Sequence, residues 1–388
     1  MTKPQQTTVE QLAGQDAWRV EQQTLSGGLQ HGVQLIEIDN GKMQITVVPT
    51  RGMSVLQAVC GGVRLGWNSP VTDVVHPSFI NLNERGGLGW LAGFNELLVR
   101  CGVEFAGAPG EDNGTLLTLH GRIGNLPADQ VQVDFDQAKD EIVLRGRVVE
   151  GAFKFGRFEL WTELATQVGS QTFTIRDRLV NVSDYTREYQ IIYHSNFGPP
   201  LLQAGSEFEA PVNRVAPIDE YSAKDLDSFT KYLGPTKDYG EQVYCLLLND
   251  DGADSDPSTV TMLRNKAADL GVALEYRTAS LPCFTLWKNT DTLTDGYVTG
   301  LEPSTSYPYN RSVERENGRV PKLEPHAAVE FGLQFEFLSG ESDVQRVRQR
   351  IGEIQAGRQV HVHQYDEEKR LWTAGSSGTN SGGAFGDK

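Results

Sequence analysis

An alternation of apolar and polar residues with a period of two is the feature of this sequence that most limits its fold. It is clearest at 329–337, where every odd position is Val, Phe or Leu and the even positions are Glu, Gly or Gln. Successive side chains of a β-strand point to opposite faces, so the pattern predicts a strand with one buried face. It recurs at 43–47 and 172–176, and several such segments between 131 and 195 suggest an antiparallel meander. With 41 glycines and 17 prolines, the chain is expected to form a large, mainly antiparallel all-β sandwich or barrel.

Helices are expected to be few and peripheral. Apolar residues recur at helical spacing over 342–355, which predicts a helix there. A second helix is predicted near 8–14.

No internal repeat and no change of composition marks a boundary between domains. We therefore predict one domain over 1–373, with its core at about 30–338 and a C-terminal helix and strand within 342–365. The Gly/Ser-rich residues 374–388 are predicted to be a flexible tail.

The formal net charge of −16 limits the partners of this 388-residue chain. Nucleic acids and anionic membrane surfaces select basic patches, so neither is expected as a partner. The substrate is expected to be neutral or to be held by a few local arginines. No signal peptide and no long apolar segment is evident, and the four cysteines are widely spaced, which favours a cytoplasmic protein with reduced thiols. Monomer and homodimer both remain open.

Two histidines and one glutamate each follow an apolar run that predicts a strand. His120 ends "LLTLH", His194 ends "QIIYH" and Glu302 follows "YVTGL". Loops at the ends of rigid strands often carry functional side chains, so these three titratable groups suit one cleft with acid/base chemistry. Taken singly, either histidine could instead be satisfied by backbone partners. The "HVH" at 361–363 has a spacing that metal sites can use, but it lacks a third ligand, and no metal site is predicted.

The segments "LHGR", "YHSNFGPPL" and "LWKNTDTLTDGYVTGLEPSTSYPYN" occur in the order and at the chain distances of three signature segments of the aldose 1-epimerases. The sequence therefore resembles this galactose-mutarotase-like family over roughly 30–338. It resembles a divergent branch of this family, because Ser195 follows His194 at a position where the family has an aromatic residue. The segments 47–70 and 85–102 are also distinctive.

The resemblance implies a galactose-mutarotase-like β-supersandwich and the interconversion of sugar anomers by ring opening, with no metal or cofactor. It assigns Glu302 as the base, His194 as the acid and His120 as a sugar-binding residue. Asp238 could correspond to the family's sugar-binding aspartate, or it could be a turn residue. For His194 to act as an acid at neutral pH, we predict that a nearby carboxylate raises its pKa.

Other polar and aromatic residues near these segments are candidates for substrate binding. Arg51, Arg122 and Lys288 could bind hydroxyls or an acidic group on a sugar, and Asn196 could contribute an amide. Trp67 could stack on a pyranose face. Two other readings remain open: a lyase or another epimerase or isomerase acting on a modified sugar at the same site, and a sugar-binding protein without turnover.

Overall fold

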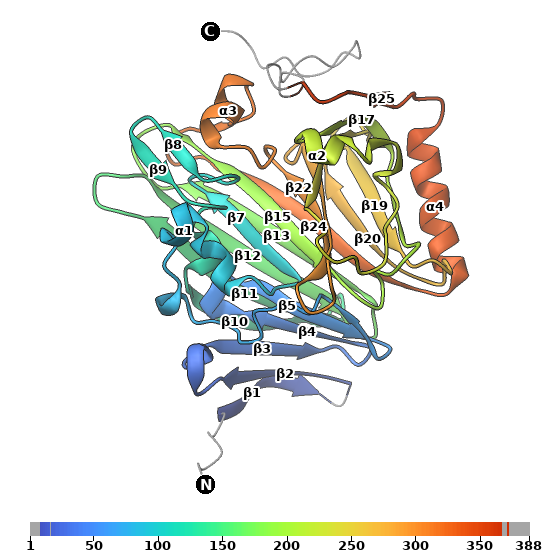
Figure 1. Cartoon of the computed structure of the whole chain (residues 1–388). Helices are drawn as coiled ribbons and strands as arrows, with labels where there is room; N and C mark the ends of the chain where they lie inside the picture. Colours follow the sequence, from blue (N-terminus) through green and yellow to red (C-terminus); the bar gives the residue numbers. More distant parts are fainter. Residues whose placement is uncertain (1–7, 16, 367–370, 372–388) are drawn as a thin grey trace.

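The computed structural model describes residues 8–366 except 16, together with residue 371. Among these residues, 13 strands form one large sheet and eight form a second. The two sheets pack against each other through a shared apolar core, and Figure 1 shows the helices at the periphery. The predicted mainly antiparallel all-β class is therefore confirmed.

The large sheet runs from an N-terminal hairpin at one edge to a short C-terminal strand at the other. In pairing order its strands are β1 (Thr8–Gln15), β2 (Trp18–Thr24), β3 (Gln34–Asp39), β4 (Met43–Val48), β5 (Ser54–Cys60), β7 (Leu98–Val103), β15 (Gln190–Phe197), β22 (Tyr297–Ser304), β21 (Cys283–Thr290), β18 (Gln242–Leu248), β17 (Val212–Pro217) and β25 (His361–Val362), with β6 (Val63–Leu65) paired to β5.

The second sheet covers one face of the first. Its order is β10 (Ala128–Asp136), β11 (Glu141–Gly151), β12 (Arg157–Gln167), β13 (Thr172–Asn181), β24 (Ala328–Ser339), β20 (Leu270–Arg277), β19 (Ser258–Arg264) and β16 (Glu207–Glu209). Two short ladders pair β8 (Gly110–Asp112) with β9 (Thr115–Leu117) and β14 (Arg187–Glu188) with β23 (Lys322–Leu323).

The helical segments are short except for the last α-helix. They are η1 (Gly28–Gln30), η2 (Pro49–Arg51), η3 (Pro77–Phe79), α1 (Glu84–Gly87), η4 (Gly89–Gly93), η5 (Ile123–Asn125), α2 (Glu220–Ala223), η6 (Leu226–Ser228), α3 (Arg311–Glu316) and α4 (Glu341–Gln355).

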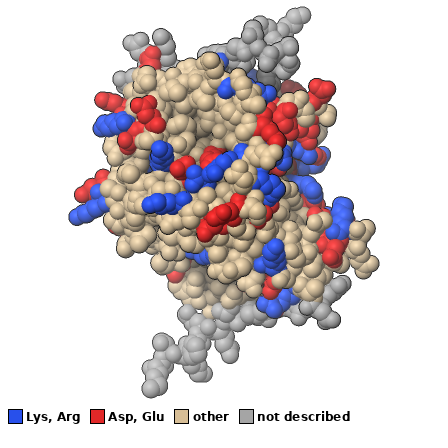
Figure 2. All heavy atoms as spheres, turned by 90° about the vertical axis from the view of Figure 1, so that its right-hand side faces the viewer, with Lys and Arg blue, Asp and Glu red and all other residues tan. Residues whose placement is uncertain are grey.

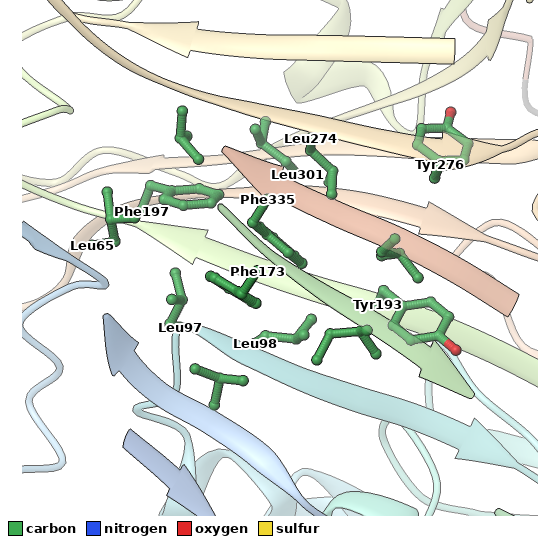
Figure 3. Close-up of a cluster of buried hydrophobic side chains, with 14 of the residues drawn as sticks. Leu65, Leu97, Leu98, Phe173, Tyr193, Phe197, Leu274, Tyr276, Leu301 and Phe335 are labelled. Carbon is green, nitrogen blue, oxygen red and sulfur yellow. The ribbon is translucent and has the colours of Figure 1, made fainter. Parts of the chain in front are cut away.

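The core between the sheets is built from the alternation seen in the sequence. Phe173 on β13 stacks on Phe335 on β24, with ring centroids 4.8 Å apart. Figure 3 shows these rings among Leu97, Leu98 and Leu301, which belong to the large sheet or lie next to it. Burying such side chains stabilises the fold by roughly 1.5–3 kcal/mol each.

A buried polar cluster also joins the two sheets. Arg100 on β7 makes a two-point ion pair with Asp177 on β13, and the hydroxyl of Tyr193 on β15 donates to the same carboxylate at 2.8 Å. All three side chains are buried. The cluster therefore holds β7 and β15 in register against the second sheet.

The structure differs from the sequence-based prediction at the N-terminus and in the meander. The helix predicted near 8–14 is wrong, because these residues lie within β1, which pairs along its length with β2. The meander prediction holds for β10 to β13, but β15 crosses to the large sheet. The helix predicted over 342–355 is confirmed as α4, whose apolar face packs on β19, β20 and β24. The tail predicted at 374–388 lies outside the described residues.

Charges on one face of the molecule are mixed. Figure 2 shows lysine and arginine side chains interleaved with aspartates and glutamates. On the second sheet, for example, Arg145 and Arg176 both pair with Glu163. In the described part of the chain, no helix is long and apolar enough to cross a membrane.

Candidate active site

The candidate site lies on the face of the large sheet that points away from the second sheet. Along β15, Tyr193 points into the shared core, so the adjacent His194 points to the opposite face. Glu302 on β22 points to that face too, since its carboxyl Oε1 lies 3.2 Å from Nε2 of His194. The sheet thus brings together two residues that are more than 100 positions apart in sequence.

Gly300 leaves the space that the Glu302 carboxyl occupies. It lies opposite Asn196 on β15 and Trp287 on β21. A Cβ at position 300 would lie 2.5 Å from Oε1 of Glu302 and 3.3 Å from Cε1 of His194. Glycine is therefore required for this close packing, which explains the "TGLE" segment.

His194 is oriented by an amide on its own strand. Its Nδ1 lies 2.6 Å from Oδ1 of Asn196. Asn196 is fully buried and its amide nitrogen donates to the carbonyls of Glu96 and His194. Asn196 was predicted to bind substrate, but its polar atoms are taken up by protein partners behind the histidine.

His120 reaches the same site from a loop. Its imidazole packs edge-on against His194, with ring centroids 5.5 Å apart. His120 has a φ of 60°, a left-handed conformation that is costly for a residue with a side chain. The next residue, Gly121, also has a positive φ, and a Cβ there would lie 2.3 Å from the carbonyl of Phe105. The "HG" pair thus forms a tight turn that directs His120 toward the site.

Aromatic side chains surround the two histidines. Trp90 lies 4.8 Å from His120, and Phe94 lies 5.2 Å from His194, measured between ring centroids. Trp287, on β21, lies 5.4 Å from His194. Its side chain is partly exposed, whereas those of Trp90 and Phe94 are buried. Aromatic faces of this kind suit the apolar face of a pyranose. His194 and Glu302 are only 5% and 2% exposed.

Burial shifts the pKa values of His194 and Glu302 in opposite directions. It raises the pKa of Glu302 well above the usual value for a carboxyl, and the nearby Glu241 adds to this effect. Burial also lowers the pKa of His194 to about 4, although the hydrogen bond to Asn196 opposes this. The predicted rise in the pKa of His194 is therefore wrong, because burial outweighs the contacts that favour the charged ring. Both shifts favour the form in which Glu302 is protonated and donates to a neutral His194.

Several buried polar atoms near this pair have no hydrogen-bond partner. They include Nδ1 of His120, whose ring packs on His194, and Oγ1 of Thr285, which is the residue opposite Glu302 on β21. Burial and the neighbouring His194 lower the pKa of His120 well below 6.5, so its ring is neutral. A neutral imidazole and hydroxyl groups are suitable partners for sugar hydroxyls. Unpaired buried polar atoms are costly, and a bound ligand would relieve that cost.

Two of the cationic residues predicted to bind substrate make contacts with other parts of the protein instead. Arg51 is fully buried and pairs with Glu96 at 2.6 Å, behind the loop that carries Phe94. Lys288 follows Trp287 on β21 and points to the other face, where its Nζ donates to the carbonyl of Lys231. Burial lowers the pKa of Lys288 to about 8.

The remaining predicted residues lie at or beyond the edge of the site. Arg122 is partly exposed and lies 3.8 Å from the buried carboxyl of Glu150. Asp238 is an exposed turn residue with a φ of 62°. Trp67 is buried beneath Phe94 and donates its indole N–H to the carbonyl of Glu96, so it supports the site from below.

Phe94, Thr285 and Gly300 were not predicted from the sequence. Phe94 lies within the distinctive segment 85–102, but the position of its side chain depends on the fold. Among the described residues, no group of three or more His, Cys, Asp or Glu side chains could hold a metal ion. The four cysteines are buried free thiols.

Comparison with known proteins identifies the family. Residues 30–337 match the model of a family described as a domain of unknown function, DUF4432. No curated protein matches the sequence. Among solved structures, the chain is similar to a Klebsiella pneumoniae protein named "putative aldose 1-epimerase". The two share 40% sequence identity over 93% of this chain and 99% of that one, with a TM-score of 0.88.

More distant structures have the same fold. A galactose mutarotase-like protein from Clostridium acetobutylicum is 14% identical, covers 84% of this chain and 100% of its own, and has a TM-score of 0.57. A galactose mutarotase related enzyme from Lactobacillus acidophilus is 15% identical, covers 79% and 98%, and has a TM-score of 0.51. This chain therefore belongs to the DUF4432 family and has the galactose-mutarotase-like fold.

Proposed function

We propose that this protein interconverts the anomers of an aldose or aldose derivative by general acid/base ring opening. The observation that carries the proposal is the contact of 3.2 Å between Nε2 of His194 and Oε1 of Glu302, buried among aromatic side chains. Ring opening needs one group that accepts a proton and one that donates a proton at a single sugar centre. A pair that shares one proton meets that need.

The proton count follows from the neutral pair. Nε2 of His194 would accept the proton of the anomeric hydroxyl while Glu302 donates its proton to the ring oxygen. The C1–O5 bond then breaks and leaves an open-chain aldehyde with no net change in charge. Rotation about C1–C2 and the reverse transfers close the ring on the other face. These roles are the reverse of those implied by the family resemblance, but the pair carries the same single proton.

Binding would rest on hydroxyl and ring contacts. Trp90 and Trp287 are suitable for stacking on the sugar, and the unpaired Nδ1 of His120 and Oγ1 of Thr285 can each bond a hydroxyl. Each positioned acid or base typically contributes about 10²- to 10⁴-fold to the rate.

The test is exchange NMR between the anomers of neutral, acidic and phosphorylated aldoses. Wild-type protein should accelerate the exchange of at least one sugar, and Glu302→Gln should lose about 10²- to 10⁴-fold of that rate with little loss of sugar affinity. Glu150→Gln is the matched control: this carboxyl is also buried and its pKa is raised to about 7, but it contacts the backbone of Val103 rather than the site.

Two outcomes would contradict mutarotation. Binding of a sugar without accelerated exchange in the wild type would favour a lyase, another epimerase or isomerase, or a binding protein. Exchange that is equally fast in Glu302→Gln would remove the carboxyl from the mechanism.

A further inference from the structure

The side-chain amide of Asn196 can be oriented without ambiguity. Its nitrogen lies 3.0 Å from the carbonyl oxygen of Glu96 and 3.1 Å from that of His194. If the amide were flipped, its oxygen would face two carbonyl oxygens with no donor between them. The nitrogen must therefore face the carbonyls, and Oδ1 must face the histidine.

This orientation decides which nitrogen of His194 carries the proton. Oδ1 of Asn196 is only an acceptor, so the Nδ1 atom 2.6 Å away must be the donor. In the neutral ring, Nε2 is then the unprotonated nitrogen, and it faces Glu302 at 3.2 Å. The amide thus leaves the lone pair of Nε2 available on the side where the carboxyl lies.

The amide is itself supported by a buried ion pair. The carboxylate of Glu96 accepts from Nε of Arg51 at 2.7 Å and from the backbone N–H of Asn95 at 3.0 Å. Arg51 also donates to the carbonyl of Val75 at 3.0 Å. Its guanidinium fills the space beside Gly93, where a Cβ would lie 2.3 Å from Nη1.

These contacts fix the peptide of Glu96, whose carbonyl also accepts the indole N–H of Trp67. The carbonyl that receives the Asn196 amide is thereby held in place from two sides. The peptide of Glu96 therefore connects the loop that carries Phe94 with Asn196 and, through Asn196, with His194.

We propose that Asn196 is a positioning residue that holds His194 in the Nδ1–H tautomer, so that Nε2 is the atom that exchanges a proton with Glu302 and substrate. The catalytic consequence rests on the proposed function, whereas the tautomer does not. Arg51 and Glu96 act one step further away by holding the carbonyl that orients the amide.

The test is ¹⁵N NMR of protein labelled at its seven histidines, with the His194 signals identified by their loss in His194→Gln. Wild-type protein at neutral pH should show a pyrrole-type Nδ1 and a pyridine-type Nε2 for His194. Asn196→Leu removes the acceptor, so the other tautomer should become populated. If Asn196→Leu does not fold, the tautomer of the wild-type protein still decides the matter, because an Nε2–H ring at His194 would by itself overturn the proposal.

Asn181→Leu is the control for the loss of a buried amide. Asn181 is equally buried and donates to backbone carbonyls, but at the end of β13. It should lower stability without changing the His194 signals. The proposal is overturned if wild-type His194 is the Nε2–H tautomer or if Asn196→Leu retains a single Nδ1–H tautomer.

The rate of anomer exchange gives a second readout. Asn196→Leu should lower kcat about 10- to 100-fold with little change in KM, the range seen when a histidine at a metal site loses its orienting partner. The NMR result needs no sugar, so a failure of mutarotation and a failure of the positioning role are distinguishable.

Discussion

At the scale of single residues, the candidate site depends on the contrast between two buried titratable groups. The same loss of hydration raises the pKa of Glu302 and lowers the pKa of His194. The sequence indicated both residues, since each follows an apolar run. The prediction that they lie at strand ends is wrong, because His194 lies within β15 and Glu302 within β22. The sequence could not indicate their protonation, because burial and the 3.2 Å contact arise only when β15 and β22 come together.

The pH dependence follows from these directions. In the active form His194 is neutral and Glu302 is protonated. The value of kcat/KM for anomer exchange should therefore rise as pH increases through about 4, where the imidazolium of His194 loses its proton. It should fall only where Glu302 ionises, well above 4.5. A pH–rate profile measures both limbs. A lower limb near 6.5, or an upper limb near 4.5, would show that the two groups titrate as exposed side chains.

At the scale of secondary-structure elements, three neighbouring strands of the large sheet carry the site: His194 lies on β15, Glu302 on β22 and Trp287 on β21. Alternation predicted strands correctly, as at 43–47, 172–176 and 329–337. It did not predict which face each residue takes in the sheet. Trp287 and Lys288 are adjacent in sequence, yet one faces the site and the other faces away. The helix predicted near 8–14 failed because pairing with β2 determines the conformation of this edge segment.

Gly300 tests whether strand packing positions the carboxyl. Gly300→Ala should displace Glu302 from His194 and slow anomer exchange about 100-fold, because small misplacements of reacting groups are costly. The control is Gly332→Ala on β24, where the nearest atom to a new Cβ is 3.5 Å away. Exchange rates of the two variants decide the matter: an unchanged rate in Gly300→Ala would mean that the close packing is not required.

At the scale of the whole molecule, the second sheet provides the platform on which the site is built. The shared core packs β13 and β24 against the strands of the large sheet, and the Arg100–Asp177–Tyr193 cluster joins the sheets through the strand that carries His194. The sequence predicted the β-sandwich class and, through the family resemblance, the three segments that meet at the site. It could not predict the buried ion pairs, whose partners are far apart in the chain.

The polar cluster between the sheets should matter for stability. Arg100→Met leaves the buried carboxylate of Asp177 without its cation and should lower the free energy of unfolding by roughly 3–5 kcal/mol. Arg176→Met, one residue before Asp177 on the same strand, breaks only a surface pair and should cost about 0–1 kcal/mol. Denaturant unfolding of both variants measures the difference, and equal costs would argue against a structural role for the buried cluster.

The central claim is that His194 and Glu302 act as one unit on a sugar. The most direct test extends the anomer-exchange measurement to His194→Gln, Glu302→Gln and the double variant. Residues that act as a unit are strongly non-additive. Each single variant should therefore lose about 10²- to 10⁴-fold, and the double variant should be no slower than the worse single one. Losses that multiply in the double variant, or the absence of any loss in one single variant, would contradict a shared proton.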